Sequence, residues 1–394
     1  MPGKMPFLIR LARLTYGNKL KAHGRLTYVN SCGADLSGGP YLILSNHVGA
    51  LDPIMISTVF PRHIRWVAGA YLFKTRFMHK LLTDWCTAIP KQQGRQDLGT
   101  FRKVHKALMS GDNVGLFPEG TRTWDGEMVP LAYKPLAKLL KIYKVNVLFV
   151  HLEGGYARSP RWADHTRRGK VVVNFKHLLT PEEIEKTDVP ELQQKIQDYL
   201  HFSNDEWKET TDYEYVNPKR AEGLQRLLYL CPSCKALDSF KTQGNRIICS
   251  KCNTITVLDE KDNLTSIDTP FSRLSQWHEW EAEEISRFKE FPPEEGVLLQ
   301  KGNYDDEGDL ETLSKHFVIH LRENAMHLEF PGSSTKPMTL PLSEVSSLVL
   351  NLKQTMELFC GEDLYRIRLL PEANSLKYLE YFTAYKKKAK EAEL

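Results

Sequence analysis

Hydrophobic positions in the first 200 residues alternate between two patterns. Short apolar runs predict buried strands at 41–45, 64–67, 114–117, 145–150 and 170–175. Between them, apolar residues recur at helical spacing over 53–59, 77–85, 97–110, 131–143 and 181–201. This alternation predicts an α/β domain with a mostly parallel sheet and flanking helices, whose chemistry lies at the carboxyl ends of the strands.

The last hundred residues follow a period of two. This alternation predicts strands at 297–300, 316–321, 326–330, 338–340, 345–350, 355–360 and 364–369. A helix from about Ser375 to Glu393 follows them. The pattern predicts a small antiparallel β-rich module at 290–394, closed by a helix, and its outline resembles a pleckstrin-homology-like barrel.

The N-terminal segment is basic and amphipathic. Residues 1–34 contain six basic residues and no acid, and apolar residues recur at near-helical spacing over 5–22. Arg10 interrupts the first apolar stretch too early for a secretory signal, and no run approaches the roughly 18 apolar residues of a spanning helix. A helix over 1–24 therefore either lies in a lipid interface or packs on its own domain.

Charge is divided unevenly along the chain. Of 394 residues, 41% are hydrophobic and 26% are charged, as in ordinary globular proteins, which excludes extensive disorder. Residues 1–200 carry 29 Lys and Arg against 16 Asp and Glu, a net charge of +13. Residues 201–394 carry 24 against 33, a net charge of −9. This asymmetry predicts an anionic partner for the first half.

The first candidate chemistry follows the strand at 41–45. His47 and Asp52 are five residues apart, about 140° apart on a helix and on opposite faces of a strand. They can meet only if the chain turns, which Gly49 allows and Pro53 favours. A His held by a carboxylate is a candidate general base; the alternative is a hydrogen-bonded histidine at a strand end. No Ser or Cys stands in a nucleophile-elbow motif, so the base would act directly on a substrate hydroxyl.

A second strand end carries an anion-binding pattern. The run Val114–Phe117 is followed by Pro118-Glu119-Gly120-Thr121-Arg122. A turn with a glycine, a hydroxyl and the planar fork of an arginine can hold a phosphate. In the alternative interpretation, Glu119 and Arg122 form a surface ion pair.

Together, Asn46-His47-(four residues)-Asp52 and Phe117-Pro-Glu-Gly-Thr-Arg122 resemble the motifs of the glycerophospholipid (PlsC-like) acyltransferases, over about residues 20–180. The resemblance implies the glycerolipid acyltransferase fold for 25–210. It also implies that His47 is the base for acyl transfer and that Asp52 orients it. The acceptor site would comprise Asn46, Glu119, Gly120, Thr121 and Arg122.

The same family has a basic block between these two motifs. It matches Leu72-Phe73-Lys74 and Ala88-Ile89-Pro90-Lys91 here. Gln93 stands where the family usually has Arg, and Arg95 follows two residues later. The resemblance therefore adds Lys74, Lys91 and Arg95 as substrate-binding candidates, and either Lys91 or Arg95 fills the basic position.

The resemblance implies transfer of a fatty acyl group from acyl-CoA or acyl carrier protein to the sn-2 hydroxyl of lysophosphatidate (1-acylglycerol-3-phosphate). The product would be phosphatidate, formed without an acyl-enzyme. The expected location is peripheral, on the cytoplasmic face of a membrane, with the phospholipid surface as a partner. Two alternatives stay open: another acceptor, such as glycerol-3-phosphate or a different lysolipid, and an inactive acyltransferase fold that serves as a zinc-ribbon adaptor.

Four of the seven cysteines form two Cys-x-x-Cys pairs, Cys231/Cys234 and Cys249/Cys252, separated by fourteen residues. With no export signal in the sequence, this spacing predicts a tetrahedral Zn²⁺ site in a zinc ribbon at 217–260 rather than disulfides. Four protein thiolates would close the site, so the zinc would be structural. The net charge of −9 on this half opposes nucleic-acid binding and favours a scaffold or protein-contact role.

Overall fold

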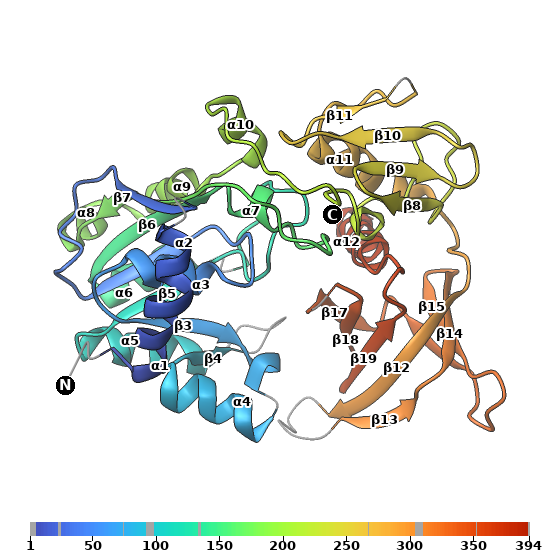
Figure 1. Cartoon of the computed structure of the whole chain (residues 1–394). Coiled ribbons are helices and arrows are strands. Elements are labelled where there is room, and N and C mark those ends of the chain that lie inside the picture. Colours follow the sequence, from blue (N-terminus) through green and yellow to red (C-terminus); the bar gives the residue numbers. More distant parts are fainter. Residues whose placement is uncertain are drawn as a thin grey trace. The chain divides into compact units, whose positions relative to one another are not determined.

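The computed structural model of the chain describes residues 5–22, 25–73, 75–91, 98–132, 135–266, 268–303, 310–351 and 353–392 (Figure 1). The chain divides into two compact units. Unit 1 comprises residues 1–161 and 166–217, and unit 2 comprises residues 162–165 and 218–394. Each unit has its own sheet structure.

Unit 1 is built on a sheet with the strand order β1-β7-β6-β2-β5-β3-β4. β2 (Tyr41–Ser45) lies at its centre, parallel to β5 (Asn113–Leu116) and to β6 (Asn146–Glu153). β3 (Ile64–Gly69) and β4 (Ile89–Lys91) extend the parallel set beyond β5. The predicted mostly parallel α/β sheet is therefore confirmed, and the carboxyl ends of β2 and β5 lie side by side.

The other side of this sheet reverses direction. β7 (Val171–Leu179) runs antiparallel to β6, and β1 (Leu26–Asn30) pairs with β7 at the edge. The hydrophobic pattern does not indicate the edge strands β1 and β4. Three of the five residues of β1 are exposed, and β4 is three residues long and contains Pro90, so neither has the continuous apolar run of a central strand.

Helices cover both faces of the sheet, because β2 sends alternate side chains to opposite sides. Leu42 and Leu44 pack with α5 (Leu98–Met109), α6 (Leu136–Tyr143) and α9 (Val189–Leu200). On the opposite side, Tyr41 and Ile43 belong to the cluster that includes residues of α3 (Asp52–Val59) and Leu20 of α2 (Asn18–Ala22). Burial on both faces explains why all five residues of β2 are buried.

The remaining helical segments of unit 1 are short. The stretch predicted as one helix at 181–201 is two, because the chain becomes extended at Thr187 and Asp188 accepts the N–H of Glu191 at 2.8 Å to start the second helix. No helix in the described part of the chain is long and apolar enough to cross a bilayer. The segments are α1 (Phe7–Ala12), π-helical η1 (Arg13–Gly17), 3₁₀-helical η2 (Ala70–Phe73), α4 (Arg76–Lys80), π-helical η3 (Leu81–Trp85), α7 (Gly155–Arg158), α8 (Pro181–Lys186) and α10 (Asn204–Glu209).

Unit 2 begins with a small antiparallel sheet around the cysteines. Its strand order is β11-β10-β9-β8. The strands are β8 (Phe240–Gln243), β9 (Arg246–Cys249), β10 (Ile255–Leu258) and β11 (Leu264–Thr265). The 3₁₀-helical η4 (Leu224–Arg226) precedes this sheet, and α11 (Leu274–Glu284) with η5 (Ile285–Arg287) follows it.

The rest of unit 2 is the predicted β-rich module. Antiparallel strands follow the order β16-β15-β14-β12-β19-β18-β17, with β13 paired to β12, and α12 (Leu376–Ala392) comes last. The strands are β12 (Glu294–Asn303), β13 (Glu311–Ser314), β14 (Phe317–Arg322), β15 (Ala325–Glu329), β16 (Met338–Pro341), β17 (Val345–Leu350), β18 (Thr355–Cys360) and β19 (Asp363–Leu369).

A buried ion cluster joins the two parts of unit 2. Lys377, on α12, is fully buried and pairs with Asp238 beside the cysteine sheet and with Glu294 at the start of β12, the latter at 2.7 Å. Tyr378 donates its hydroxyl to Glu294 at 2.8 Å. Because a buried ammonium needs its counter-charges, these contacts tie the cysteine sheet to the β-rich sheet within one compact unit.

Candidate active site and metal centre

His47 and Asp52 meet at the carboxyl end of β2. The chain leaves the strand at Ser45, turns through Val48 and Gly49, and enters α3 at Asp52. His47 Nδ1 and Asp52 Oδ2 are 2.8 Å apart. The same oxygen accepts the backbone N–H groups of Val48 and Gly49, each at 2.8 Å. The turn therefore fixes the carboxylate, and the carboxylate orients the imidazole ring.

The surroundings of His47 favour its neutral form. Burial lowers the pKa of His47, the hydrogen bond and charge of Asp52 raise it, and the charges of Arg122 and Arg161 lower it further, with a net shift below the usual range. Nε2 has no hydrogen-bond partner among the described residues, and the side chain keeps 21% of its surface exposed. A neutral imidazole with one nitrogen accessible in this way can accept a proton from a hydroxyl group.

The loop after β5 holds the backbone of His47 from both sides. The N–H of His47 donates to Glu119 Oε1 at 2.7 Å, and the carbonyl of His47 accepts the N–H of Thr123 at 3.0 Å. Two motifs about seventy residues apart are thus joined by hydrogen bonds to the backbone of His47, as expected for loops that leave adjacent parallel strands at the same edge.

Glu119 braces this arrangement. Its second oxygen accepts the N–H of Val129 at 3.1 Å, so both oxygens face backbone amides, and the residue is buried. Burial raises the pKa of Glu119 to about 8, although the two amide donors oppose this shift. Both oxygens of Glu119, which the sequence places in the acceptor site, thus accept backbone amides and tie the His47 turn to the loop after β5.

Three stacked rings set the plane of the imidazole. His47 stacks on Phe117 with ring centroids 4.1 Å apart, and Phe117 stacks on Trp66 at 4.9 Å. Trp66 is anchored through its indole N–H to Ser57 at 3.0 Å. Gly115 makes room for the indole, since a Cβ at that position would lie 2.4 Å from it. The glycine in the predicted strand therefore has a packing role.

Thr121 and Arg122 are held by an arginine that the motifs do not contain. Arg161 Nη1 donates to Thr121 Oγ1 at 3.0 Å and to the carbonyl of Arg122 at 3.2 Å. Its guanidinium lies over the ring of Trp124, 4.3 Å from the centroid. Gly120 has a φ of +71°, which favours glycine, and its N–H closes the turn. The hydroxyl and cationic groups expected of an anion site are therefore clustered.

The other predicted site residues have different placements. Asn46 is buried and its Oδ1 accepts the N–H of Leu152 on β6 at 2.8 Å, so it anchors the end of β2 to the sheet. Lys91 ends β4, a parallel strand, and is half-buried. Lys74 and Arg95 lie outside the described residues.

Arg161 and Trp66 are the residues that the sequence interpretation missed. Arg161 comes about forty residues after the turn it supports, and no local spacing connects the two. The composition does point to this region as a candidate anion-binding segment, because four arginines occur within 158–168, in the half of the chain with excess positive charge. Trp66 lies in a predicted strand, where an aromatic residue is ordinarily read as core.

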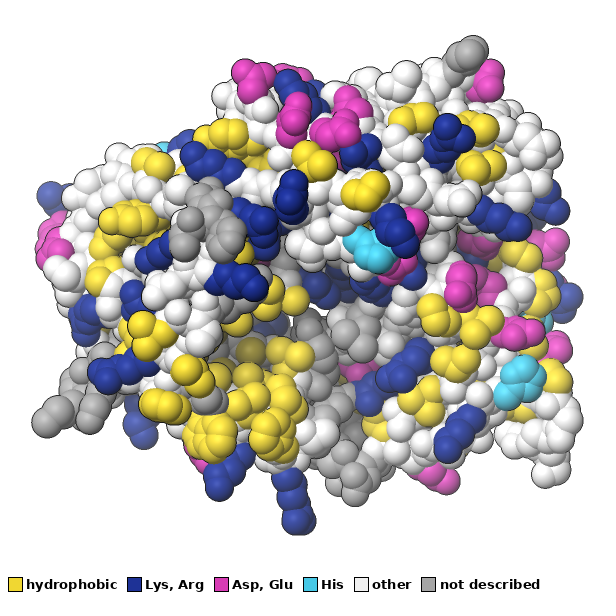
Figure 2. All heavy atoms as spheres, in the orientation of Figure 1, with side chains coloured by type: hydrophobic (Ala, Val, Ile, Leu, Met, Phe, Trp, Pro, Cys, Tyr) yellow, Lys and Arg dark blue, Asp and Glu magenta, His cyan; other side chains and the backbone are white. Residues whose placement is uncertain are grey.

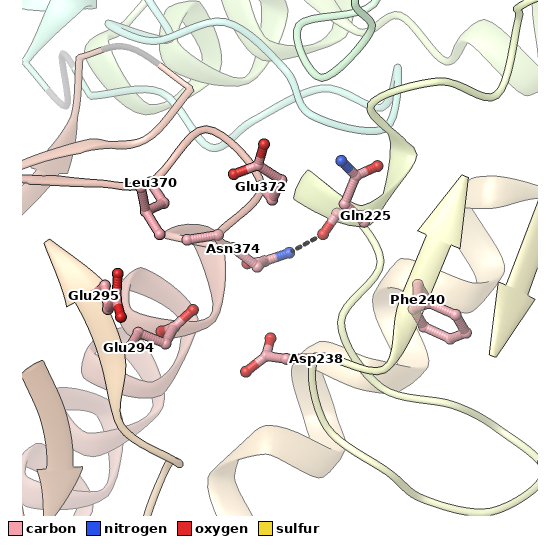
Figure 3. A pocket seen from close by; sticks show the side chains of 9 residues that line it. Gln225, Asp238, Phe240, Glu294, Glu295, Leu370, Glu372 and Asn374 are labelled. Carbon is pink, nitrogen blue, oxygen red and sulfur yellow. Dashed lines mark hydrogen bonds between the residues drawn. The ribbon is translucent and has the colours of Figure 1, made fainter. Parts of the chain in front are cut away.

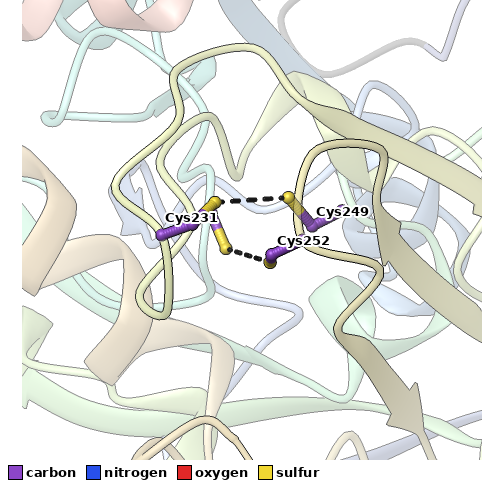
Figure 4. A group of neighbouring side chains, drawn as sticks. Cys231, Cys249 and Cys252 are labelled. Carbon is purple, nitrogen blue, oxygen red and sulfur yellow. Dashed lines mark hydrogen bonds between the residues drawn. The ribbon is translucent and has the colours of Figure 1, made fainter.

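The four cysteines converge at one point (Figure 4). Their sulfur atoms all lie within 4.8 Å of one another. The Cys231–Cys252 and Cys234–Cys249 sulfur pairs are each separated by 3.7 Å. Tetrahedral Zn²⁺ with bonds of about 2.3 Å would place its sulfur ligands about 3.8 Å apart, whereas a disulfide requires about 2.05 Å. The spacing suits a metal-bound thiolate cluster.

The two cysteine turns share one backbone conformation. The N–H of Lys235 donates to the carbonyl of Cys231, and the N–H of Asn253 donates to that of Cys249, both at 2.9 Å. Lys235 and Asn253 each follow the second cysteine of their turn and have positive φ values of 58° and 60°. Two turns of the same shape, each presenting a pair of sulfurs, fit the donor set of a structural zinc.

Unit 2 also contains a cavity of about 230 Å³ (Figure 3). Asp238, Glu294, Glu295 and Glu372 line it, together with Gln225, Phe240, Leu370, Ala373 and Asn374. Asn374 closes one side by donating to the carbonyl of Gln225 at 3.0 Å. Asp238 and Glu294 also pair with Lys377, so this cavity adjoins the buried ion cluster of unit 2.

Known proteins resemble the first part of the chain. Residues 20–162 match the family model named Acyltransferase. The 1-acyl-sn-glycerol-3-phosphate acyltransferase of Saccharomyces cerevisiae is 25% identical over 172 residues, which are 42% of this chain and 56% of that protein. The chain therefore spans little more than half the length of this relative.

Two solved structures have weaker likenesses. The lysophosphatidate acyltransferase PlsC of Thermotoga maritima aligns over 51% of this chain and 79% of its own, with 18% identity and a TM-score of 0.41. The N-terminal PH domain of human ARAP2 aligns over 24% of this chain and 81% of its own, with 13% identity and a TM-score of 0.19. Both TM-scores are below 0.5, so neither likeness bears on function.

Proposed function

We propose, from the match of residues 20–162 to the acyltransferase family model, that this chain acylates the sn-2 hydroxyl of 1-acylglycerol-3-phosphate with an acyl thioester, giving phosphatidate. The observation that carries the proposal is the His47–Asp52 pair, locked onto the loop that presents Thr121 and Arg122. This arrangement places a candidate base, His47, beside a candidate phosphate site at Thr121 and Arg122.

His47 would act as the general base. As the acceptor oxygen attacks the thioester carbonyl, Nε2 takes the hydroxyl proton, and the Asp52 carboxylate stabilises the imidazolium that forms. Collapse of the tetrahedral intermediate breaks the carbon–sulfur bond, and the thiolate leaves with the proton that His47 returns. No hydroxyl or thiol side chain within the described residues is bonded to His47, which favours this direct transfer over an acyl-enzyme.

The acceptor's phosphate would bind at Thr121 and Arg122. Arg161 would keep both in place through Thr121 Oγ1 and the Arg122 carbonyl, and it adds a second positive charge. Lys91 would supply a further cation from the end of β4. The donor would be acyl-CoA or acyl carrier protein.

An acceptor screen tests this function. Purified full-length protein would be given labelled acyl-CoA or acyl carrier protein with lysophosphatidate, glycerol-3-phosphate or a neutral lysolipid. We expect phosphatidate from lysophosphatidate, and formation at least about 100-fold slower with the His47→Ala variant. Acylation of another acceptor alone would refute the substrate, and no acylation at all would favour an inactive fold.

The cysteine cluster would hold one structural Zn²⁺ per chain, bound by Cys231, Cys234, Cys249 and Cys252. The equal 3.7 Å sulfur separations and the matched turns support this assignment. Elemental analysis of purified protein should find about one zinc per chain. Absence of zinc and of any other bound metal would refute it.

The chain would work peripherally on the cytoplasmic face of a membrane. α1 exposes Phe7 and Leu11, and the following η1 exposes Leu14, a spacing of i, i+4, i+7 that places them on one face of a helical segment. Arg10 is exposed on the same helix. An exposed apolar stripe beside basic residues supports contact with lipid. Fractionation of cells into soluble and membrane-bound protein would test the location.

A further inference from the structure

A second part of unit 1 exposes an apolar stripe. Phe77, Leu81 and Trp85 follow one another at four-residue spacing along α4 and η3. Phe77 is 67% exposed and Trp85 is 44% exposed. Leu72, in the preceding η2, is also exposed. A helical segment that points such residues outward leaves apolar area in water, and such area marks a contact surface.

This stripe adjoins the N-terminal helix. α1 and η3 are in contact, although about seventy residues separate them along the chain. Figure 2 shows hydrophobic side chains gathered over the region of α4, with Lys and Arg side chains at the edge. We call the combined area of Phe7, Leu11, Leu14, Leu72, Phe77 and Trp85 the apolar surface; all six are exposed large hydrophobic side chains.

The charges around the apolar surface are mostly positive. Arg76 and Lys80 are exposed on α4, and Arg10 is exposed on α1. Asp84 is the one acid between residues 71 and 91, and residues 1–34 contain none. Apolar side chains that project beyond a basic rim complement a bilayer with anionic headgroups, because the rim meets the headgroups and the side chains reach the acyl region.

We propose that the α4–η3 segment is a second membrane-binding element, which inserts Phe77 and Trp85 into an anionic bilayer beside α1. The inference deepens the peripheral location proposed for this chain and rests on it. Two separate elements on one surface would fix the orientation of unit 1 on the lipid more firmly than one short helix would.

Vesicle binding without substrates tests the proposal independently of catalysis. Full-length protein would be floated with phosphatidylcholine vesicles that contain or lack phosphatidylglycerol. We expect Phe77→Ser to weaken binding to the anionic vesicles on the order of ten-fold, because the serine leaves little apolar area to bury. Binding should also fall with added salt.

The matched control is Ile142→Ser. Ile142 is 61% exposed near the end of α6, so it is also a helical and exposed hydrophobic residue of unit 1, but it lies outside the apolar surface. We expect this variant to bind vesicles as the unchanged protein does. Equal weakening by both substitutions, or none from Phe77→Ser, would overturn the proposal.

Fluorescence locates the inserted ring. Phospholipids brominated on the acyl chains should quench tryptophan emission of the bound protein, and Trp85→Phe should remove part of that quenching while it keeps an aromatic ring at the site. If Trp85→Phe is quenched to the same extent as the unchanged protein, the proposal that Trp85 inserts into the bilayer is overturned. A dimer without vesicles that Phe77→Ser converts to monomer would show that a second copy covers this surface, and would overturn the proposal as well.

The outcomes separate this inference from the proposed function. If the enzyme acylates lysophosphatidate but Phe77→Ser binds vesicles normally, the second element is refuted and the activity stands. If vesicle binding falls as expected but no acceptor is acylated, the membrane element stands and the activity is refuted.

Discussion

The His47 site and the cysteine cluster are both made from two turns, but they are held in different ways. At His47 the turns are joined by protein hydrogen bonds: Glu119 accepts the N–H of His47, and the carbonyl of His47 accepts that of Thr123. At the cysteines, four sulfur atoms lie within 4.8 Å of one another, and as thiolates they would repel one another. The first site is preorganised by the chain, whereas the second needs a cation to balance its thiolates.

Because of this difference, we expect substitutions at the two sites to change different measured quantities. Changes in the reacting side chains at the first site should alter rates and leave the fold intact. Changes at the second should alter the stability of unit 2, because metal-binding free energy there would be folding free energy.

The largest expected effect is on the cysteine cluster. Replacing Cys249 with Ser should abolish zinc binding and lower the thermal unfolding temperature of unit 2, since structural zinc contributes on the order of 10 kcal/mol in small zinc-binding peptides. Calorimetry with metal analysis would measure both. Cys32→Ser is the control, because Cys32 lies in unit 1 outside the cluster. An unchanged transition in Cys249→Ser would refute the structural role.

The second prediction concerns the base. His47→Ala should lower kcat about 10²- to 10⁴-fold, the usual contribution of a general base, with little change in unfolding temperature. His201→Ala is a matched control: His201 also precedes an acid, Glu206, by five residues at 3.7 Å, but both side chains are mostly exposed. Full activity in His47→Ala, or equal losses in the two variants, would contradict the assignment.

The third prediction concerns the acceptor's phosphate. Arg122→Ala should raise the acceptor KM about 10- to 100-fold with a smaller effect on kcat, because phosphate binding is largely made in the ground state. Arg161→Ala should act in the same direction but more weakly, and Arg161→Lys should restore charge without the hydrogen bonds to Thr121 and Arg122. An unchanged KM in Arg122→Ala would remove this turn from the acceptor site.

The smallest expected effect is a shift in pH dependence. Protonated His47 cannot accept a proton, so the rate should fall as the pH drops through its pKa, which burial places below 6.5. Arg122 and Arg161 also lower this pKa, so neutralising Arg161 should raise it and move the acid limb of kcat/KM to higher pH. If the acid side of the kcat/KM profile lies at the same pH in Arg161→Ala, the charge of Arg161 does not affect the pKa of His47.

The parts of the fold that the sequence predicted best are those decided locally. β17 and β18 were placed to the residue, because period-two alternation and turn residues delimit them. The break between α8 and α9 was missed although Asp188, the N-cap of α9, is present in the sequence, because apolar periodicity continues across it. The edge strand β1 lacked a signal, since it buries only part of one face.

In the candidate site, too, the sequence predicted the features that are decided locally and missed those that depend on the tertiary fold. The meeting of His47 and Asp52 followed from one turn of five residues. The bracing role of Glu119 did not, because it depends on the N–H groups of His47 and Val129, which the fold brings from either side. Arg161 reaches Thr121 only through the packing of unit 1, so a spacing rule within one strand-end motif does not reveal it.

The buried Lys377 has a consequence for how unit 2 can be divided. A truncation between the cysteine sheet and β12 would separate Asp238 from Glu294 and leave each fragment with part of a cluster that is closed in the whole chain. Loss of one partner of a buried pair typically costs about 3–5 kcal/mol, enough to unfold a small domain. The two sheets of unit 2 should therefore be expressed together, and a boundary near residue 290 is unsuitable for any shortened protein.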